Sequence, residues 1–497
     1  MKRLLLSPVI VFAGFASLAV AAPPSDSGAL DATFGNAGKV QLAPVPDIGI
    51  ASHALDAAVQ ADGKVVFVGY DAINASCGGG TPCVSESWRI TRLAANGSLD
   101  TAFGGEQTGT RYYGNGLSPT RAQGVAVRSD GHVVVAGTYC CHTDGSKFIV
   151  VLQLKADGTP DDAFGDGALM AVSGSASGDD VSLARMILDS DGSIDLVGTY
   201  RVAASNSNQF FFDRVAAGGR SDEPFRFIFG GGANQDAHAM DVAIDRQGRY
   251  VVAGYAPGPH GYDCAVIRIT RDLYDVDRTF GHTAPDDYGY QTIAFDYAGD
   301  DNDVCNAVAI FPGGHIALGG HATADAGNGT YQAAALAELD DAGQPASYFS
   351  GGLLYPTKFA FAYGPTSASL DSDIARLVVD AYDTKYPQLL AIGSGYQSGI
   401  PYGQQFGIAR VNPPQTYSNF ALDGTFAGDG TLGLWFVERP DGVGLLRTNN
   451  GGFGAAFGSG QLVVAGDTQV PAGTQAALAR LVAFDGIFRN GFDTPSY

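Results

Sequence analysis

The chain has 497 residues, 45% of them apolar, which is enough to form the core of several domains or of one large repeat architecture. Only 16% of the residues are charged and 69 are glycine, a composition that excludes a coiled coil or a disordered chain and favours strands and turns. The formal net charge is −22 and no Lys/Arg-rich run offsets it, which excludes nucleic acid as a partner. So acidic a surface favours an extracellular protein that attracts cations or basic partners.

The first 21 residues have the features of a secretory signal peptide. Lys2 and Arg3 precede an apolar run from Leu4 to Val20, and Ala19-Val-Ala21 forms a small-residue cleavage site. We therefore predict a signal peptide at 1–21 and a secreted protein, whether extracellular, surface-bound or periplasmic; a retained N-terminal anchor is the alternative. No later stretch is long and apolar enough to predict a membrane span after cleavage.

Six cysteines lie in what should be an oxidising compartment, so disulfides are expected. Cys77 and Cys83 flank a glycine-rich turn, and we predict that they form a local bridge. The pairing of the other four stays open; they are Cys140, Cys141, Cys264 and Cys305.

One block recurs along the chain: an apolar run, an Asp-Gly or glycine turn, and a β-rich run that ends in glycine. The first copy reads Ala57-Ala-Val-Gln-Ala-Asp-Gly-Lys-Val-Val-Phe-Val-Gly69. Later copies begin at Val125, Met186, Val242, Val308 and, in degenerate form, Leu377. The copies, with a second degenerate one at the end, close on Gly69, Gly137, Gly198, Gly254, Gly320, Gly393 and Gly466. β-rich runs on both sides of such a turn predict a β-hairpin in each copy.

A second block follows most hairpins and consists of a strand, a turn and the pattern Leu-Asp-x-x-Phe-Gly, as in Leu99-Asp-Thr-Ala-Phe-Gly104. Each unit of about 66 residues thus holds about four strands, and these repeats predict an all-β, seven-bladed β-propeller at 22–486. An orphan Leu30-Asp-Ala-Thr-Phe-Gly35 precedes the first hairpin, whereas the last unit lacks this pattern. We therefore expect the N-terminal strand to complete the seventh blade and close the ring; an open β-solenoid is the alternative.

These units resemble the delta-60 repeat of bacterial secreted and surface proteins, which combines an Asp-Gly-Lys hairpin, an Ala-Arg-Leu strand and Leu-Asp-x-x-Phe-Gly. The resemblance covers about residues 28 to 486, although the third, sixth and seventh units drift from the pattern. It implies a propeller-like repeat protein and no common activity or catalytic set.

Two repeated residue types are predicted to be structural. An arginine precedes the third-strand apolar residue in most units, and we expect it to pair with the aspartate of Leu-Asp-x-x-Phe-Gly. The arginines are Arg92, Arg214, Arg268, Arg410 and Arg480, and the aspartates are Asp31, Asp100, Asp277 and Asp423. The repeated phenylalanines are expected to pack between blades.

Acidic residues also gather at the start of the first strand of several units. In a propeller these equivalent loops surround one mouth of the central channel, so their carboxylates could bind Ca²⁺. The candidate ligands are Asp180, Asp236, Asp301, Asp303, Asp371 and Asp373. A solvated acidic rim is the alternative, and no other cofactor is indicated.

The sequence contains no G-x-S-x-G, H-E-x-x-H or G-x-G-x-x-G pattern of a known catalytic type. The leading hypothesis is therefore a non-catalytic, monomeric binding platform for a protein or glycan partner. The alternative is a secreted hydrolase or lyase that acts on a saccharide or lactone-like substrate with channel-mouth carboxylates; a structural envelope component is a third possibility. An enzyme should show a deep central pocket with converging histidines and carboxylates. The C-terminal tail, 487–497, is either a degenerate last strand or a docking tag.

Overall fold

The computed structural model describes residues 28 to 488 with internal gaps. The gaps are 78–80, 105–107, 115–119, 143, 175, 222–223, 230–235, 272–274, 285–286, 296–301, 326–329, 347, 351–352, 356–357, 362–370, 381–386, 397–403, 414–419, 425, 428–430, 435–453, 459–460, 471–472 and 483–486. The predicted signal peptide at 1–21 and most of the predicted tail therefore lie outside the described residues.

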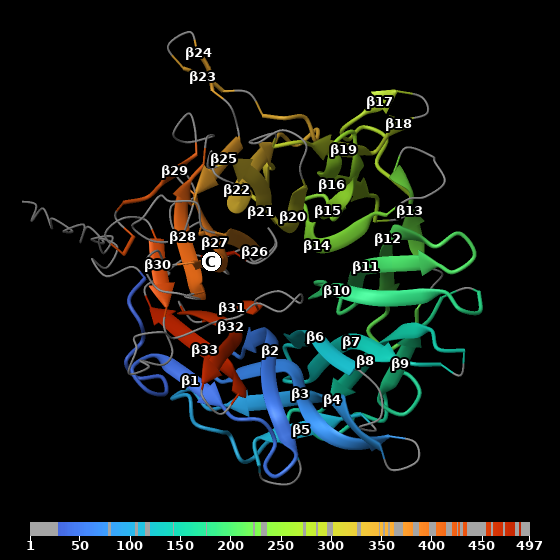
Figure 1. The fold of residues 1–497 in the computed structure, drawn as a ribbon, viewed down its shortest axis with the longest axis vertical. Helices are drawn as coiled ribbons and strands as arrows, with labels where there is room; N and C mark the ends of the chain where they lie inside the picture. The colour runs from blue at the N-terminus through green and yellow to red at the C-terminus, as the bar shows by residue number, and fades with distance from the viewer. Residues whose placement is uncertain are drawn as a thin grey trace, which may run out of the picture.

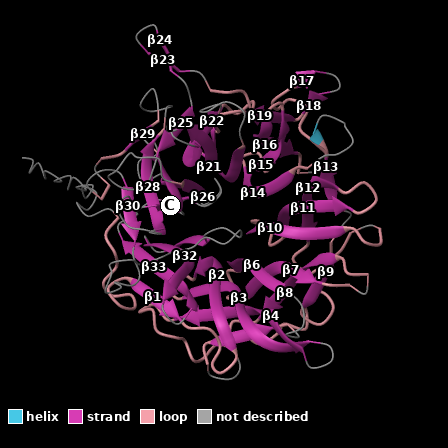
Figure 2. Ribbon diagram, in the orientation of Figure 1, coloured by secondary structure: helices cyan, strands magenta, loops and turns pink. Residues whose placement is uncertain are grey.

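Small antiparallel sheets are arranged around a common centre, as the blades of a propeller are (Figure 1). Strands, turns and loops make up nearly all of the described residues, which contain no α-helix; the short cyan segment near β13 in Figure 2 is a 3-10 turn. The first three sheets are β2(Gly49–Val59), β3(Val65–Cys77), β4(Thr81–Leu93) and β5(Thr110–Tyr113); β6(Thr120–Val127), β7(Val133–Cys140), β8(Lys147–Leu154) and β9(Leu169–Val172); and β10(Asp180–Leu188), β11(Ile194–Val202), β12(Ser207–Val215) and β13(Phe225–Phe227).

The next three sheets follow the same order. They are β14(His238–Ile244), β15(Tyr250–Gly258), β16(Gly261–Ile269) and β19(Tyr290–Ile293); β20(Asp303–Ile310), β21(Ile316–Asp325), β22(Thr330–Leu339) and β25(Lys358–Phe361); and β26(Ser372–Asp380), β27(Gln388–Tyr396) and β28(Gln404–Asn412) with β29(Ala421–Leu422) and β30(Thr431–Leu434). Two short hairpins project from the loops: β17(Thr283–Ala284) with β18(Asp287–Tyr288), and β23(Tyr348–Ser350) with β24(Leu353–Tyr355).

Both ends of the described chain pair with existing sheets. The N-terminal β1(Lys39–Leu42) pairs with β33(Gly473–Val482), which continues to β32(Gln461–Val470) and β31(Gly454–Gly458). At the other end, β34(Ile487–Phe488) pairs with β26, so the first two residues of the predicted tail add a strand to that sheet. One parallel contact, between Ala51 and Thr474, links β2 to β33.

The predicted hairpins are confirmed at the Asp-Gly turns. Gly63, for example, joins β2 to β3 with a φ of +80°, and Gly131 joins β6 to β7 with a φ of +88°. Glycine is the residue that adopts this left-handed conformation without a steric penalty, so the local sequence sets the position of each turn.

The glycine that closes each repeat has a different role. Gly69 faces Ala54 across the β2–β3 ladder, and a Cβ atom at Gly69 would collide with the carbonyl oxygen of His53. The same close approach occurs at Gly137, Gly198, Gly254, Gly320 and Gly393. In each case a β-bulge follows in the innermost strand, directly after the residue that pairs with the glycine. These glycines thus allow a bulge that redirects the next side chains of the innermost strand.

The core lies between neighbouring sheets. One buried cluster joins Val66 and Ile90 of the β2–β5 sheet to Val135 and Leu152 of the next, and equivalent clusters follow around the molecule. The repeated phenylalanines are buried in these clusters, as predicted: Phe34, Phe103, Phe164, Phe280 and Phe426 are each at most 1% exposed.

The predicted pairing of repeated arginines and aspartates is confirmed in four units. Nε of the arginine lies 2.7–2.9 Å from a carboxylate oxygen in the pairs Arg92–Asp100, Arg268–Asp277, Arg410–Asp423 and Arg480–Asp31. Arg214 differs, since it pairs with Asp189 and Asp191 instead. In the β6–β9 sheet, Gln153 takes the arginine's place and donates to Asp161.

Two disulfides are described. Cys264 of β16 and Cys305 of β20 link neighbouring sheets, and Cys140 pairs with its neighbour Cys141. Cys83 is also disulfide-bonded, but the side chain of Cys77, its predicted partner, lies outside the described residues. In the part of the chain that the structure describes, no helix has the length and apolarity needed to cross a membrane.

Candidate functional site: the central cavity

The bulges place one residue of each innermost strand at the same level of the central channel. This residue directly follows the bulge and precedes the first residue of each repeat copy. In sheet order from β2 to β26, these residues are Asp56, Gly124, Arg185, Asp241, Ala307 and Arg376. Two aspartates and two arginines from four different sheets therefore occur at one level, separated by two small residues.

Arg185 lies between the two aspartates. Its Nη1 is 3.2 Å from Oδ1 of Asp56, and its Nε is 3.4 Å from Oδ1 of Asp241. Burial lowers the pKa of Arg185, but the two carboxylates outweigh that effect and raise it. The guanidinium is therefore held in its charged form.

The second oxygen of each aspartate is also bonded. Oδ2 of Asp56 accepts the backbone N–H of Val125 at 3.1 Å, and Oδ2 of Asp241 accepts that of Val308 at 3.0 Å. Each carboxylate is thus fixed by the neighbouring sheet as well as by Arg185. Such pre-organised, buried carboxylates are typical of binding and catalytic sites.

Arg376 has no comparable partner. The residue is only 5% exposed, yet within the described part of the chain its one hydrogen bond runs from Nη1 to the carbonyl oxygen of Ala375, at 2.8 Å. Its Nε is buried without a hydrogen-bond partner. Burial and the nearby charge of Arg185 lower the pKa of Arg376 to about 10, against the attraction of Asp241 and Asp56. The group therefore stays charged at neutral pH.

A cavity of about 460 Å³ adjoins these four charges. Its walls are mainly apolar side chains from the C-terminal halves of the innermost strands, among them Val59, Val127, Leu188, Ile244, Ile310 and Val379. Asp189 and Ser190 also line it, and Asp189 is bonded to Arg214 and Arg271. A cavity lined largely by apolar residues, with a few converging polar groups, is the usual form of a small-molecule site.

Two histidines precede the channel aspartates on the same strands, in the sequences His53-Ala-Leu-Asp56 and His238-Ala-Met-Asp241. Nδ1 of His53 lies 2.6 Å from Oδ2 of the buried Asp467, and the ring stacks on Tyr70. Nε2 of His238 lies 2.9 Å from Oδ1 of Asp236. Neither histidine lines the cavity; both lie nearer to the N-terminal ends of the innermost strands.

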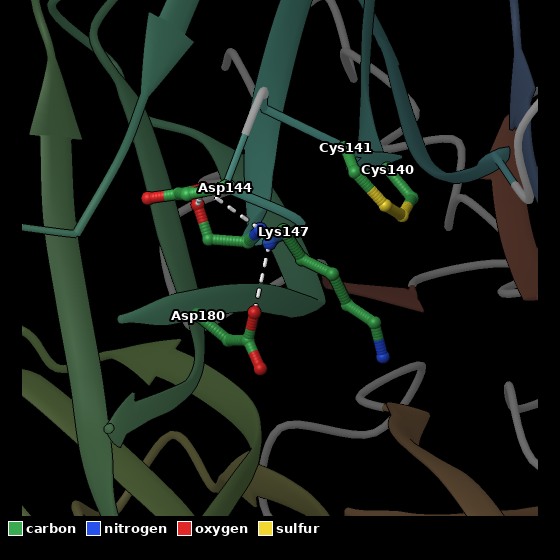
Figure 3. The surroundings of a disulfide bond; sticks show 6 residues. Cys140, Cys141, Asp144, Lys147 and Asp180 are labelled. Atoms are coloured by element: carbon green, nitrogen blue, oxygen red, sulfur yellow. Dashed lines mark hydrogen bonds between the residues drawn. A yellow bond between two sulfur atoms is a disulfide. The ribbon is translucent and has the colours of Figure 1, made fainter. Parts of the chain in front are cut away.

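The predicted calcium ligands bond to their own surroundings. Asp180 accepts the backbone N–H of Lys147 at 2.8 Å, near the Cys140–Cys141 disulfide (Figure 3). Asp236 accepts hydrogen bonds from Asn208 and from the Tyr262 hydroxyl.

Three other predicted ligands lie around one histidine. His321 interacts electrostatically with the carboxylates of Asp303, Asp371 and Asp373, and its Nδ1 is 3.1 Å from Oδ1 of Asp373. Burial lowers the pKa of His321, but these carboxylates outweigh it and raise the pKa. Among the described residues no three acidic, histidine or cysteine side chains are arranged to hold a metal ion. Asp301 lies outside the described residues, and the calcium site stays a prediction.

The channel charges were not among the residues singled out from the sequence. The repeat copies begin at Ala57, Met186, Val242 and Leu377, each one residue after a channel position. A signal was nevertheless present, because the position just before each copy varies between Asp, Gly, Arg and Ala while the repeat itself keeps its pattern. Only the bulge shows that this variable position faces the channel.

Comparisons with known proteins support a propeller-like repeat protein. A family model described as a domain of unknown function (DUF5122), beta-propeller, matches residues 60–103 and 128–164. No curated protein matches the chain.

Several solved structures are similar to the chain. One is the polysaccharide lyase Uly1, at 12% identity and a TM-score of 0.48, over 89% of this chain and 92% of the other. Another is the α-L-arabinofuranosidase Arb93A of Fusarium graminearum, at 11% identity and a TM-score of 0.40, over 72% and 92%. A third is Trypanosoma rangeli sialidase, at 7% identity and a TM-score of 0.38, over 89% and 58%.

These neighbours are saccharide-active enzymes by name, and they contradict the sequence-based hypothesis of a non-catalytic binding platform. That hypothesis is wrong. The structure also has the feature expected of the alternative, a central pocket with converging carboxylates, although Asp56 and Asp241 converge there with arginines rather than with histidines.

Proposed function

We propose that the protein is a saccharide-active enzyme, a hydrolase or a lyase, and that its substrate binds in the central cavity. The observation that carries this proposal is the convergence of Asp56 and Asp241 on Arg185 beside a cavity of about 460 Å³. Sugars have both hydroxyl groups and apolar C–H faces, so charged acceptors beside aliphatic walls suit them.

The two reaction types would use the same residues differently. Glycoside hydrolysis commonly uses a pair of carboxylates, as acid and as base or nucleophile, and Asp56 and Asp241 form such a pair. Elimination by a lyase needs a base and a cation that neutralises developing negative charge, and an aspartate and an arginine of the channel match these roles.

The proposed fold is a seven-bladed propeller closed by the N-terminal strand. Pairing of β1 with β33 supports closure, as does the buried cluster that joins Val65 and Phe67 to Val463 and Leu478. Closure would fix the spacing of the innermost strands, and with it the channel geometry, because no sheet edge would be left free.

We also propose that the chain is a secreted, monomeric delta-60 protein with a signal peptide at 1–21. The apolar run that ends at Ala19-Val-Ala21 and the repeated motifs support this proposal. A secreted enzyme would meet polysaccharides outside the cell.

The test is an activity screen of the mature protein on neutral and uronate-containing polysaccharides. New reducing ends alone indicate a hydrolase, and ultraviolet absorbance from an unsaturated sugar indicates a lyase. We expect Asp56→Asn and Asp241→Asn to lower the rate by about 100-fold or more, while each amide oxygen still accepts the neighbouring N–H. Asp162→Asn, at an exposed site, is the matched control. The proposal fails if no polysaccharide is cleaved or if both channel variants keep full activity.

A further inference from the structure

The channel has an internal two-fold pattern. Asp56, Gly124 and Arg185 on three consecutive sheets correspond to Asp241, Ala307 and Arg376 on the next three. The residues at the bulges of the second and fifth sheets also correspond. The side-chain amide of Gln123 donates to the carbonyl oxygen of Leu183, and the side-chain amide of Asn306 donates to the carbonyl oxygen of Ile374. Arg376 is therefore the counterpart of Arg185.

The two arginines differ in their partners. Arg185 has a carboxylate on each side, at 3.2 and 3.4 Å, whereas no carboxylate of the described residues lies within ion-pair distance of Arg376. Because Arg376 is 95% buried and lines the cavity, water provides little compensation for its charge. A buried, unpaired guanidinium that lines a cavity is a site for an anion.

We propose that Arg376 binds the carboxylate of an acidic sugar, so that the substrate of the proposed enzyme carries a uronic acid. This inference rests on the proposed function for the reaction, but the binding site stands on the geometry alone. The four channel charges sum to zero, so one bound carboxylate leaves a single net negative charge in the cavity. A doubly charged phosphate would leave two, at a higher desolvation cost. A planar carboxylate also fits the paired N–H groups of a guanidinium.

The experiment measures binding rather than turnover. Glucuronate, glucose, acetate and inorganic phosphate are titrated calorimetrically into the mature protein and into Arg376→Gln, Arg376→Lys and Arg278→Gln. Arg278 is an exposed arginine whose loss matches the change in net charge. Thermal unfolding of each variant checks that it is folded.

We expect glucuronate to bind the wild type about 10-fold more tightly than glucose or acetate, and more tightly than phosphate. Arg376→Gln should lose this preference, Arg376→Lys should keep part of it because only the planar geometry is lost, and Arg278→Gln should keep all of it. The inference is overturned if glucuronate does not bind, or if glucose or acetate binds the wild type as tightly as glucuronate does. It is also overturned if a folded Arg376→Gln variant keeps the preference for glucuronate.

The outcomes separate this inference from the proposed function. Uronate binding that depends on Arg376, without cleavage of any polysaccharide, supports the site and overturns the enzyme. Cleavage of neutral polysaccharides without a uronate preference supports the enzyme and overturns the site.

Discussion

Arg480 binds Asp31 across 449 positions of the sequence, with Nε and Nη2 at 2.8 and 2.7 Å from the same carboxylate oxygen. Both side chains are buried, and the Arg480 guanidinium also lies over the ring of Phe34. One ion pair thus joins the N-terminal repeat fragment to the last long strand.

Loss of this ion pair should destabilise the whole domain. Asp31→Asn would leave Arg480 buried without its counter-charge, and we expect a loss of about 3–5 kcal/mol in the free energy of unfolding. Urea unfolding measures it. Asp62→Asn, at an exposed hairpin turn, should cost at most about 0.5 kcal/mol. Equal costs for the two variants would contradict the role given to Asp31.

The disulfide between Cys264 and Cys305 should stabilise the molecule because it closes a loop between neighbouring sheets, across 41 positions. Chain-entropy arguments put the loss in a Cys264→Ala/Cys305→Ala variant at about 3–4 kcal/mol, measured by urea unfolding. Cys140→Ala/Cys141→Ala is the control, since adjacent residues close no loop. The explanation is wrong if the two double variants lose the same stability.

Asp195 should oppose folding at neutral pH. It is fully buried, neither carboxylate oxygen has a hydrogen-bond partner, and burial raises its pKa to about 8. At a pH at which Asp195 is ionised in the unfolded chain but protonated in the folded protein, folding takes up a proton. The contribution of Asp195 to the free energy of folding therefore becomes less favourable as the pH rises from about 4 to about 8.

Asp195→Asn should remove that dependence. We expect the variant to be more stable than wild type by on the order of 2–4 kcal/mol at pH 7.5, with a smaller difference near pH 4. Denaturant unfolding across this pH range gives both values. A variant less stable than wild type at pH 7.5 would argue against the buried, protonated carboxyl.

His315 should stabilise the protein in acid. Its Nδ1 lies 2.8 Å from Oε1 of the buried Glu338, and this hydrogen bond raises the pKa of His315 above 6.5. Because the folded pKa is the higher one, the stabilisation is fully present below pH 6.5 and is lost as pH rises through the folded value.

The corresponding test is His315→Gln in urea at several pH values. The stability difference from wild type should be largest near pH 5.5 and shrink toward pH 9. His142→Gln is the control, because His142 is exposed and no described carboxylate lies within ion-pair distance of it. A difference that does not change with pH would refute the ion pair.

Much of the fold could be predicted because its signals are local. Asp-Gly turns between β-rich runs specify the hairpins, and the pattern Leu-Asp-x-x-Phe-Gly placed the aspartate of Arg92–Asp100 and the buried ring of Phe103 correctly. Each of these features lies within a single repeat and recurs, so the pattern shows it several times.

The site was not predicted because its members come from four repeats. By itself the sequence determined the hairpins, the repeat length and the pairing of Arg92, Arg268 and Arg410 with the aspartates of their own units, since these depend on backbone conformation and on near neighbours along the chain. Only the tertiary structure decided that Asp56, Arg185, Asp241 and Arg376 meet. The bulge beside each closing glycine redirects the side chains of the innermost strand, and the packing of neighbouring sheets brings these side chains to one level of the channel.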